Sequence, residues 1–310
     1  MKLVCACVTI FSVGVLSKQP DSVPDGISRR GFLVAGGVSL LAASGCASTP
    51  PPASKRLSVD VLNDPNFNVE AMARLTSTMA VGETGRTYYS GKAFGVFADG
   101  RTIPFYGIDG VGSLRALPQP NGAIRFLFSE FAVYTDLVTG EPLRTWKNPV
   151  TNETVEVWHQ RNGPVNYELD PAKPSFGAFT RTAASKPGFL LPWRVSGDTA
   201  TFVIDTVSER KNPMDTAVWK RESSGATMHI SEHGQYAVAL DDLLNPELKS
   251  LQLRASLQSL KPWHPWMMMG QLPGKVFTVM TARRVRGLDE LPAAVAAVAR
   301  EQLADRKSVV

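Results

Sequence analysis

Short runs of alternating hydrophobic and polar residues fill most of the chain after residue 80. In segments such as 124–135 and 199–208, apolar residues recur at every second position with few exceptions, and clusters of Gly, Pro, Asn and Asp separate the segments. This spacing is typical of antiparallel strands joined by turns. Because no helical pattern stands between neighbouring strands, the sequence favours a β-sandwich or a β-barrel over βαβ units.

Three segments follow the period of a helix instead. Residues 63–80 open with an Asp-Pro start signal and carry apolar residues at helical spacing. Residues 240–253 predict a shorter helix with Asp241 as its N-cap. Residues 288–306 carry a stripe of Leu and Val, which predicts a closing helix near the C-terminus.

Turn residues indicate how some of the strands connect. Residues 138–141 and 148–153 read as two tight turns, because Gly tolerates positive φ and Asn-Pro favours turn initiation. Together they predict three consecutive antiparallel strands. The glycines of residues 107–113 precede strand-like sequence rather than a helix, so we interpret them as turn or bulge positions.

Residues 1–46 are interpreted as a leader. Ser-Arg-Arg-Gly-Phe-Leu, from residue 28, resembles the twin-arginine export signal of bacteria, so residues 28–46 are the predicted signal and the twin-arginine translocase is the predicted partner during export. The apolar run that follows is shorter than the roughly 20 residues of a membrane-spanning helix. An arginine pair that only flanks an apolar segment is the alternative.

Cys46 marks the end of the leader. Ala-Ser-Gly-Cys resembles a lipoprotein processing box, although Ala43 stands where that pattern prefers Leu, so Cys46 is a candidate for lipidation and simple cleavage is the alternative. The stretch 47–62 predicts a flexible tether, and residues 63–310 predict one domain. The protein is then exported, and is periplasmic or lipid-anchored at the cell envelope. It meets the membrane only through its signal or lipid anchor.

The first 27 residues fit this scheme less simply. They contain a second apolar run, which is either another signal core or the result of a start codon assigned too early, and we favour a start nearer Arg29. The three cysteines are Cys5, Cys7 and Cys46. The body therefore has neither a disulfide framework nor a thiolate nucleophile or metal ligand.

Charge and motifs exclude several function classes. The formal net charge of +5 over 310 residues is too small and too dispersed to indicate a nucleic-acid partner. The sequence lacks a Gly-x-Ser-x-Gly elbow, a phosphate loop and a dinucleotide fingerprint after a strand. His229 and His233 flank what we interpret as a turn, without an evident third ligand. We therefore predict neither a cofactor nor a metal site.

Residues 130–169 carry a motif that resembles a known family. Its reduced form is Tyr-x-Asp, Thr-Gly-Glu, Trp-x-Asn-Pro-x-Thr, Val-Glu-Val-x-His and Asn-x-Pro-Val-Asn, in that order. It resembles the bacterial family catalogued as domain of unknown function 1838, and residues 263–274 are similar to a loop of that family rich in Trp and Met. The resemblance covers about residues 68–286. It implies export and no established activity.

The resemblance also completes the expected fold. It implies an antiparallel β-barrel of the lipocalin-like or calycin-like type, by analogy at the level of the fold. With the helices indicated by the periodicity, we expect a mainly β protein with an N-terminal and a C-terminal helix. Such a barrel can leave an interior large enough for one small ligand.

Glu130 is the first candidate for chemistry. If the strand over residues 124–135 is unbroken, Glu130 shares one face with Phe126, Phe128 and Tyr134. A carboxyl group in such surroundings has a raised pKa and can act as a general acid or base. A bulge that turns Glu130 outward, or an arginine partner, is the alternative.

His159 is the only histidine of the central motif. An imidazole directed inward can move a proton or orient a ligand, while a core histidine bonded to a backbone carbonyl is the alternative. Asn162 and Asn166 follow it, and their amides suit the polar group of a ligand. Both side chains are equally suited to stabilising the turn at Pro164.

Three functions remain open. The leading hypothesis is an exported barrel that binds a small apolar or aromatic molecule without a cofactor. Its ligand-binding residues would be Phe126, Phe128, Trp146, Asn162, Asn166, Trp193, His264 and Trp266. The alternative is a cofactor-free lyase, isomerase or hydrolase with His159, Glu130 and Tyr134 as catalytic groups. The third is a structural envelope protein with a filled interior, in which residues 263–269 form a plug rather than a lid.

Overall fold

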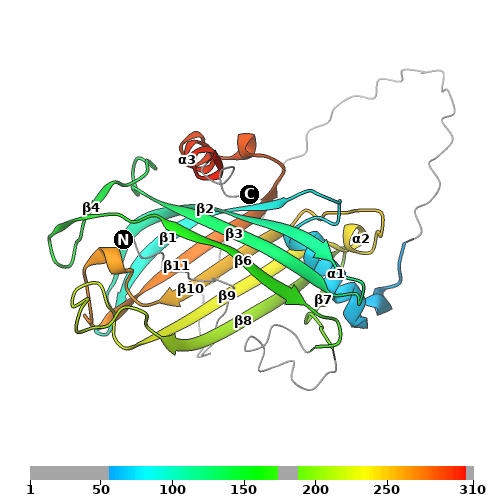
Figure 1. The fold of residues 1–310 in the computed structure, drawn as a ribbon, viewed down its shortest axis with the longest axis horizontal. Coiled ribbons are helices and arrows are strands. Elements are labelled where there is room, and N and C mark those ends of the chain that lie inside the picture. The colour runs from blue at the N-terminus through cyan, green and yellow to red at the C-terminus, as the bar shows by residue number, and fades with distance from the viewer. Residues whose placement is uncertain (1–55, 174–187, 305–310) are drawn as a thin grey trace, which may run out of the picture.

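The computed structural model describes residues 56–173 and 188–304, the last four of these by their backbone alone. The predicted twin-arginine signal, Cys46 and most of the predicted tether lie outside the described residues. The fold begins within the tether's last residues, because a 3-10 helix, η1, spans Val59–Asn63 and Leu62 is buried in the main core. Figure 1 shows the sheet and helices that follow.

A nine-stranded antiparallel sheet makes the body of the molecule. Its strand order is β6-β3-β2-β1-β11-β10-β9-β8-β7. The strands are β1 (Gly85–Phe97), β2 (Thr102–Pro118), β3 (Ile124–Thr135), β6 (Gln160–Leu169), β7 (Arg194–Ser196), β8 (Thr199–Lys211), β9 (Thr227–Ala239), β10 (Arg254–Lys261) and β11 (Gly274–Val285). This confirms the mainly β, antiparallel prediction.

The sheet curls into a half-barrel (Figure 1). A closed barrel was expected from the sequence, but β6 and β7 are edge strands, and within residues 56–173 and 188–304 neither has a second strand partner. Whether the outermost strands of a sheet pair depends on the tilt and stagger of the whole sheet. Alternation within single strands does not encode these properties.

Alternation along β3 separates an inner face from an outer face, as the sequence predicts. The buried inner positions are Ile124, Phe126, Phe128, Glu130, Ala132 and Tyr134. Arg125, between two of them, is exposed. Most of the apolar inner residues of the sheet belong to one hydrophobic core, whose burial is the main favourable term of folding.

Helix α1 (Pro65–Thr76) covers one end of the half-barrel (Figure 1). Asp64 caps it, because its carboxylate accepts a hydrogen bond from the N–H of Asn66 at 2.9 Å. The helix is shorter than the predicted 63–80. It ends where the chain turns to the sheet, and the Ser77 hydroxyl donates to the carbonyl oxygen of Leu114 on β2 at 2.7 Å.

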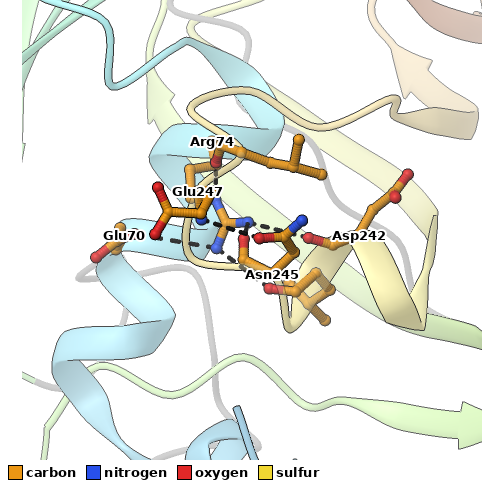
Figure 2. A network of polar contacts seen from close by, with 7 residues as sticks. Glu70, Arg74, Asp242, Asn245 and Glu247 are labelled. Carbon is orange, nitrogen blue, oxygen red and sulfur yellow. Dashed lines mark hydrogen bonds and ion pairs between the residues drawn. The ribbon is translucent and has the colours of Figure 1, made fainter. Parts of the chain in front are cut away.

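The segment after β9 is held by Arg74 of α1. The helix expected over 240–253 is a single turn, α2 (Leu240–Leu243), and its N-cap is Ala239 rather than Asp241. The Arg74 guanidinium, whose side chain is only 1% exposed, reaches into the loop that follows α2 (Figure 2). It donates to the backbone carbonyl oxygens of Leu248, Leu243, Asp242 and Asn245 at 2.8, 3.1, 3.0 and 2.6 Å. The loop therefore has its carbonyls satisfied without continuing as a helix.

The glycines of residues 107–113 lie inside β2 and pair with β3 in a continuous register, so their interpretation as turn or bulge positions is wrong. They allow close approach of side chains to the sheet. A Cβ atom on Gly110 would lie 2.2 Å from the ring of its cross-strand partner Tyr89. Gly110 thus makes room for the Tyr89 side chain on the inner face.

Gly91 of β1 gives a stability test with a matched control. A Cβ atom there would lie 2.0 Å from the backbone oxygen of Val279, so Gly91→Ala should lower the free energy of unfolding by about 2 kcal/mol or more. At Gly112 the nearest atom to such a Cβ is 3.6 Å away, in the Phe128 ring. Gly112→Ala should change stability by less than about 1 kcal/mol. Urea unfolding measures both, and equal losses would contradict the predicted contact.

The predicted three-stranded meander is only partly present. The turn at 148–153 joins β4 (Thr145–Lys147) to β5 (Thr154–Glu156), which form a separate hairpin. Before that hairpin, the chain after β3 meets β3 only at the bridge between Thr135 and Pro142. β3 pairs along most of its length with β6 instead. A strand that is more distant in sequence therefore takes the place expected for the strand that follows β3 directly.

The C-terminal helix packs on the outer face of the sheet. α3 (Ala293–Ala304) lies above β2 in Figure 1 and follows a 3-10 turn, η4 (Leu288–Glu290). A second, smaller core joins it to the sheet and includes Val111, Val285, Leu291, Val295, Ala296 and Ala299. Among the helices of the described chain, none combines the length and the apolarity needed to cross a bilayer.

Candidate functional site: a polar layer inside the half-barrel

Six polar side chains from five strands gather on the inner face of the sheet. We call them the polar layer: Tyr89 of β1, Glu130 of β3, Gln160 and Asn162 of β6, Glu232 of β9, and Lys261 of β10. Four of them, Tyr89, Glu130, Asn162 and Glu232, are almost fully buried. Buried polar groups are kept only where they are paired or have a function.

Glu130 is the centre of the polar layer and is 8% exposed. Its Oε2 atom accepts hydrogen bonds from Asn162 Nδ2 at 2.6 Å and from Gln160 Nε2 at 3.0 Å. The Tyr89 hydroxyl also bonds to this carboxyl group. Burial raises the pKa of Glu130, while the bonds from Tyr89 and Asn162 and the charge of Lys261 oppose that rise. The site therefore favours a protonated carboxyl group more than water does.

The strand pairing explains why Glu130 points inward. Phe128 pairs with Val165 and Glu130 pairs with Asn162, so the extra residue of this irregular pairing belongs to β6. The bulge lies at Gly163 and Pro164, which are joined by a cis peptide bond. β3 stays unbroken, and a bulge in β3 that turns Glu130 outward is thus excluded.

A second charged pair completes the polar layer. Lys261 Nζ lies 2.7 Å from Glu232 Oε1, and the Glu232 side chain is 4% exposed. Glu232 is flanked across the sheet by Thr206 and Ser259, and the Ser259 and Thr278 hydroxyls are 2.6 Å apart. A polar row therefore crosses the inner face from β8 to β11.

A set of aromatic rings lies near the polar layer, because His264 is close enough to Lys261, and Tyr134 to Tyr89, for these groups to interact electrostatically. We call Tyr106, Tyr134, Trp146, His264 and Trp266 the aromatic cluster. The ring centroids of Tyr106 and Tyr134 are 4.9 Å apart, and each lies 5.4 Å from the Trp266 ring. Trp146 Nε1 donates to the carbonyl oxygen of Phe105 at 3.2 Å. These rings come from β2, β3, β4 and the segment around η3 (Pro265–Met267), so the chain regions of the family-like motif meet here.

Apart from Glu232 Oε1, which is ion-paired with Lys261, three buried polar atoms of this region have no protein hydrogen-bond partner within the described chain: Asn162 Oδ1, Tyr106 Oη and Trp266 Nε1. One is an acceptor, one is a donor, and the tyrosine hydroxyl can be both. Each such atom costs about 1–3 kcal/mol when it is left unbonded. Their placement in one region requires an explanation other than packing.

His159 lies at the edge of the aromatic cluster, between β5 and β6. Its Nδ1 atom accepts a hydrogen bond from the backbone N–H of Tyr134 at 3.1 Å, and the two ring centroids are 6.1 Å apart. Burial and the charge of Arg161 lower the pKa of His159, so the imidazole is neutral near pH 7. His159 is therefore bonded to Tyr134 and makes no hydrogen bond to Glu130.

The predicted ligand-binding residues divide into separate groups. Trp146, His264 and Trp266 belong to the aromatic cluster, and Asn162 belongs to the polar layer. Phe126 stacks on Tyr167 at 5.0 Å, and the neighbouring inner position of β3 is Phe128.

Trp193 and Asn166 lie apart from both groups. Trp193 Nε1 donates to Asn68 Oδ1 at 2.8 Å near α1. Asn166 is exposed, while the residues before and after it in β6 are partly buried. The prediction that its side chain binds a ligand inside the barrel is therefore wrong. Its amide belongs to the outer face of β6, because successive side chains of a strand point to opposite faces.

The residues Tyr89, Gln160, Glu232 and Lys261 are not among the site residues predicted from the sequence. Glu232 could have been found from the sequence. It occupies one of the alternate positions that apolar residues fill along the strand over residues 227–239, which marks it as a polar residue facing inward. The expectation of a turn between His229 and His233 hid that signal. Both histidines lie on β9, where they face Glu209 and Asp205 of β8 at 3.5 and 3.0 Å. The described residues contain no group of three or more His, Cys, Asp or Glu side chains suited to a metal.

The comparison with known families bears on this same region. Residues 82–306 match the model of the family described as "Protein of unknown function (DUF1838)". The chain belongs to this family. The match spans the whole sheet, with the polar layer and the aromatic cluster, and it extends over α3. No curated protein matches the chain. For this DUF1838 member, a function therefore has to be argued from the site.

His264 gives a pH test of the aromatic cluster. Burial lowers the pKa of His264 to about 3, so the folded protein keeps this imidazole neutral while the unfolded chain takes up a proton below about pH 6.5. Stability is then lost as pH falls from 6.5 toward 3. Between pH 7 and pH 5, the wild type should lose about 2 kcal/mol more than His264→Phe. Urea unfolding at both pH values measures this, and equal losses would contradict the burial of the ring.

Proposed function

We propose that the half-barrel binds one small, largely apolar molecule whose polar group is held at the polar layer. The observation that carries the proposal is a set of three buried polar atoms without a protein partner in the described chain: Asn162 Oδ1 next to the Glu130 carboxyl group, and Tyr106 Oη and Trp266 Nε1 in the aromatic cluster. A ligand with a hydroxyl, carbonyl or carboxyl group supplies such partners. The rings of the aromatic cluster suit its apolar part.

The charges of the polar layer narrow the class of polar group. Lys261 and Glu232 neutralise each other at 2.7 Å, and the pKa of Glu130 is raised. The layer is thus close to neutral when Glu130 is protonated. A neutral group such as an alcohol, ketone or amide matches this balance better than an ion, because an unpaired charge would be costly to bury.

Small molecules that co-purify with the protein test the proposal. Solvent extraction followed by mass spectrometry should find one compound retained by the wild type. Tyr106→Phe removes one unpartnered hydroxyl and leaves the ring, so retention should fall about tenfold, as expected for one hydrogen bond. Tyr88→Phe is the matched control, because the Tyr88 hydroxyl bonds to Asp109 outside this region. An empty wild type, or equal retention by all three proteins, would contradict the proposal.

Acid–base chemistry on the bound molecule is a second candidate. It is favoured by the raised pKa of Glu130 and by the Tyr89 hydroxyl bonded to it, which together resemble the environment of a general acid. Incubation of the extracted compound with fresh protein tests this. Conversion by the wild type and none by Glu130→Gln supports an enzyme, and an unchanged compound with the wild type contradicts it.

We further propose that the protein acts after export through the twin-arginine route. The support is the sequence from residue 28 alone. Replacing Arg29 and Arg30 together by lysine should leave the protein in the cytoplasm, as cell fractionation would measure. Normal export of this variant would contradict the proposal, and the same fractionation separates a lipid-anchored from a periplasmic form.

A further inference from the structure

A basic pocket lies at the surface, away from the polar layer. Its volume is about 530 Å³, and it is formed where β10 begins, where β11 ends and along the segment that follows β11. Four arginines line it, Arg254, Arg283, Arg284 and Arg286, together with one carboxylate, Glu290. Arg254 and Arg283 are exposed and flank the pocket from two neighbouring strands.

The strand register places two of these positive charges directly opposite each other. Arg254 of β10 pairs with Arg283 of β11, and like charges at paired positions repel. The one carboxylate is already used: Glu290 Oε2 lies 3.2 Å from Arg283 NH1, and Glu290 Oε1 accepts the backbone N–H of Arg286 at 3.0 Å. The side chains of Arg254 and Arg286 have no hydrogen bond or ion pair to a residue of the described chain.

Arg284 adds a buried charge at the pocket wall. It is 9% exposed, and its guanidinium makes one long hydrogen bond, to the carbonyl oxygen of Leu75 at 3.4 Å. Burial and the charge of Arg86 lower the pKa of Arg284 to about 10, so it remains charged at neutral pH. The buried Arg86 Nε also lacks a hydrogen-bond partner in the described chain. The Arg284 charge therefore adds to the positive field around the pocket, while its guanidinium is turned toward α1.

We propose that this pocket binds a small oxyanion, a phosphate group either free or carried by a small molecule. The guanidinium fork matches the paired oxygens of phosphate, and several forks around one pocket can bind several oxygens. Binding would relieve the repulsion between Arg254 and Arg283.

The oxyanion site does not depend on the function proposed for the interior. Arg283 lies with its guanidinium carbon 5.6 Å from the centroid of the Tyr88 ring, and Tyr88 packs in the outer core beneath α3. The polar layer lies on the opposite, inner face of the sheet. Failure of one proposal therefore leaves the other intact.

Calorimetric titration of the purified protein with inorganic phosphate at low ionic strength tests the site. Arg254→Gln and Arg286→Gln should each weaken binding by about tenfold, since each removes one charge-assisted contact. Both side chains lack protein partners, so the variants should keep the fold, which circular dichroism checks. Glu290→Gln should tighten binding, because it removes the competing negative charge while keeping a carbonyl acceptor.

Arg125→Gln is the matched control, because Arg125 is an exposed arginine of β3 outside the pocket. It should bind phosphate as the wild type does. Equal weakening by Arg125→Gln, or the same heat from sodium chloride at matched ionic strength, would overturn the site. If glycerol phosphate binds more tightly than inorganic phosphate, the natural ligand is a small molecule that carries a phosphate group. If the two bind equally, the natural ligand is free phosphate, and either result supports the proposal.

Discussion

Replacing Arg74 with methionine is expected to lower the free energy of unfolding by about 3–5 kcal/mol. The Arg74 guanidinium donates to four backbone carbonyls, two at the end of α2 and two in the loop that follows it (Figure 2). Methionine fills similar volume but donates no hydrogen bond. The melting temperature should fall by roughly 6–20 °C for a domain of this size.

The matched control for Arg74 is Arg101→Met. Arg101 pairs with Asp99 at 2.7 Å, but its side chain is 66% exposed, so its loss should cost less than about 1 kcal/mol. Urea unfolding of the three proteins gives both differences. Similar losses for the two variants would mean that Arg74 does not hold the loop in the way the hydrogen bonds indicate.

Replacing Glu130 with alanine is expected to lower the free energy of unfolding by about 3 kcal/mol. The change leaves the amides of Asn162 and Gln160 and the hydroxyl of Tyr89 without their shared acceptor. It also leaves a cavity in the inner face. Glu130→Gln keeps a carbonyl oxygen for the two amides, so its effect should be much smaller.

The pH dependence of Glu130→Gln tests the protonation of this site. Because burial raises the pKa of Glu130 above its ordinary value of 4.5, the folded state holds this proton more tightly than the unfolded state. The stabilisation is complete below pH 4.5 and is lost as pH rises through the folded-state pKa. Glutamine has no such loss, so the variant should gain stability relative to the wild type from pH 4.5 upward. If the difference in the free energy of unfolding between Glu130→Gln and the wild type did not change with pH, the raised pKa of Glu130 would be contradicted.

Much of the fold follows from local sequence pattern. The alternation in β3 predicts the buried face that carries Glu130, and the period of residues 63–80 predicts α1, because both signals come from residues close in sequence. The helix predicted after β9 shrinks to one turn for a non-local reason. Arg74, more than 160 residues earlier in the chain, bonds to the carbonyls that a helix would have used.

The candidate site was predictable only in part, and the reason is again distance along the chain. Glu130 was found because its own strand marks it as an inward polar residue. Its partners Tyr89 and Asn162 come from strands on either side, and only the sheet order brings them together. His159 and Glu130 share a motif, yet the partner of His159 is the backbone N–H of Tyr134, a contact that the motif does not reveal.

A crystal structure of protein purified without added ligand tests the central claim most directly, namely that the polar layer holds the polar group of a small molecule. The account predicts continuous non-protein density of several atoms, with one end within hydrogen-bond distance of Asn162 Oδ1 or Tyr106 Oη and the other against the aromatic cluster. Isolated water molecules bonded to those atoms, or an interior filled by side chains alone, would contradict it.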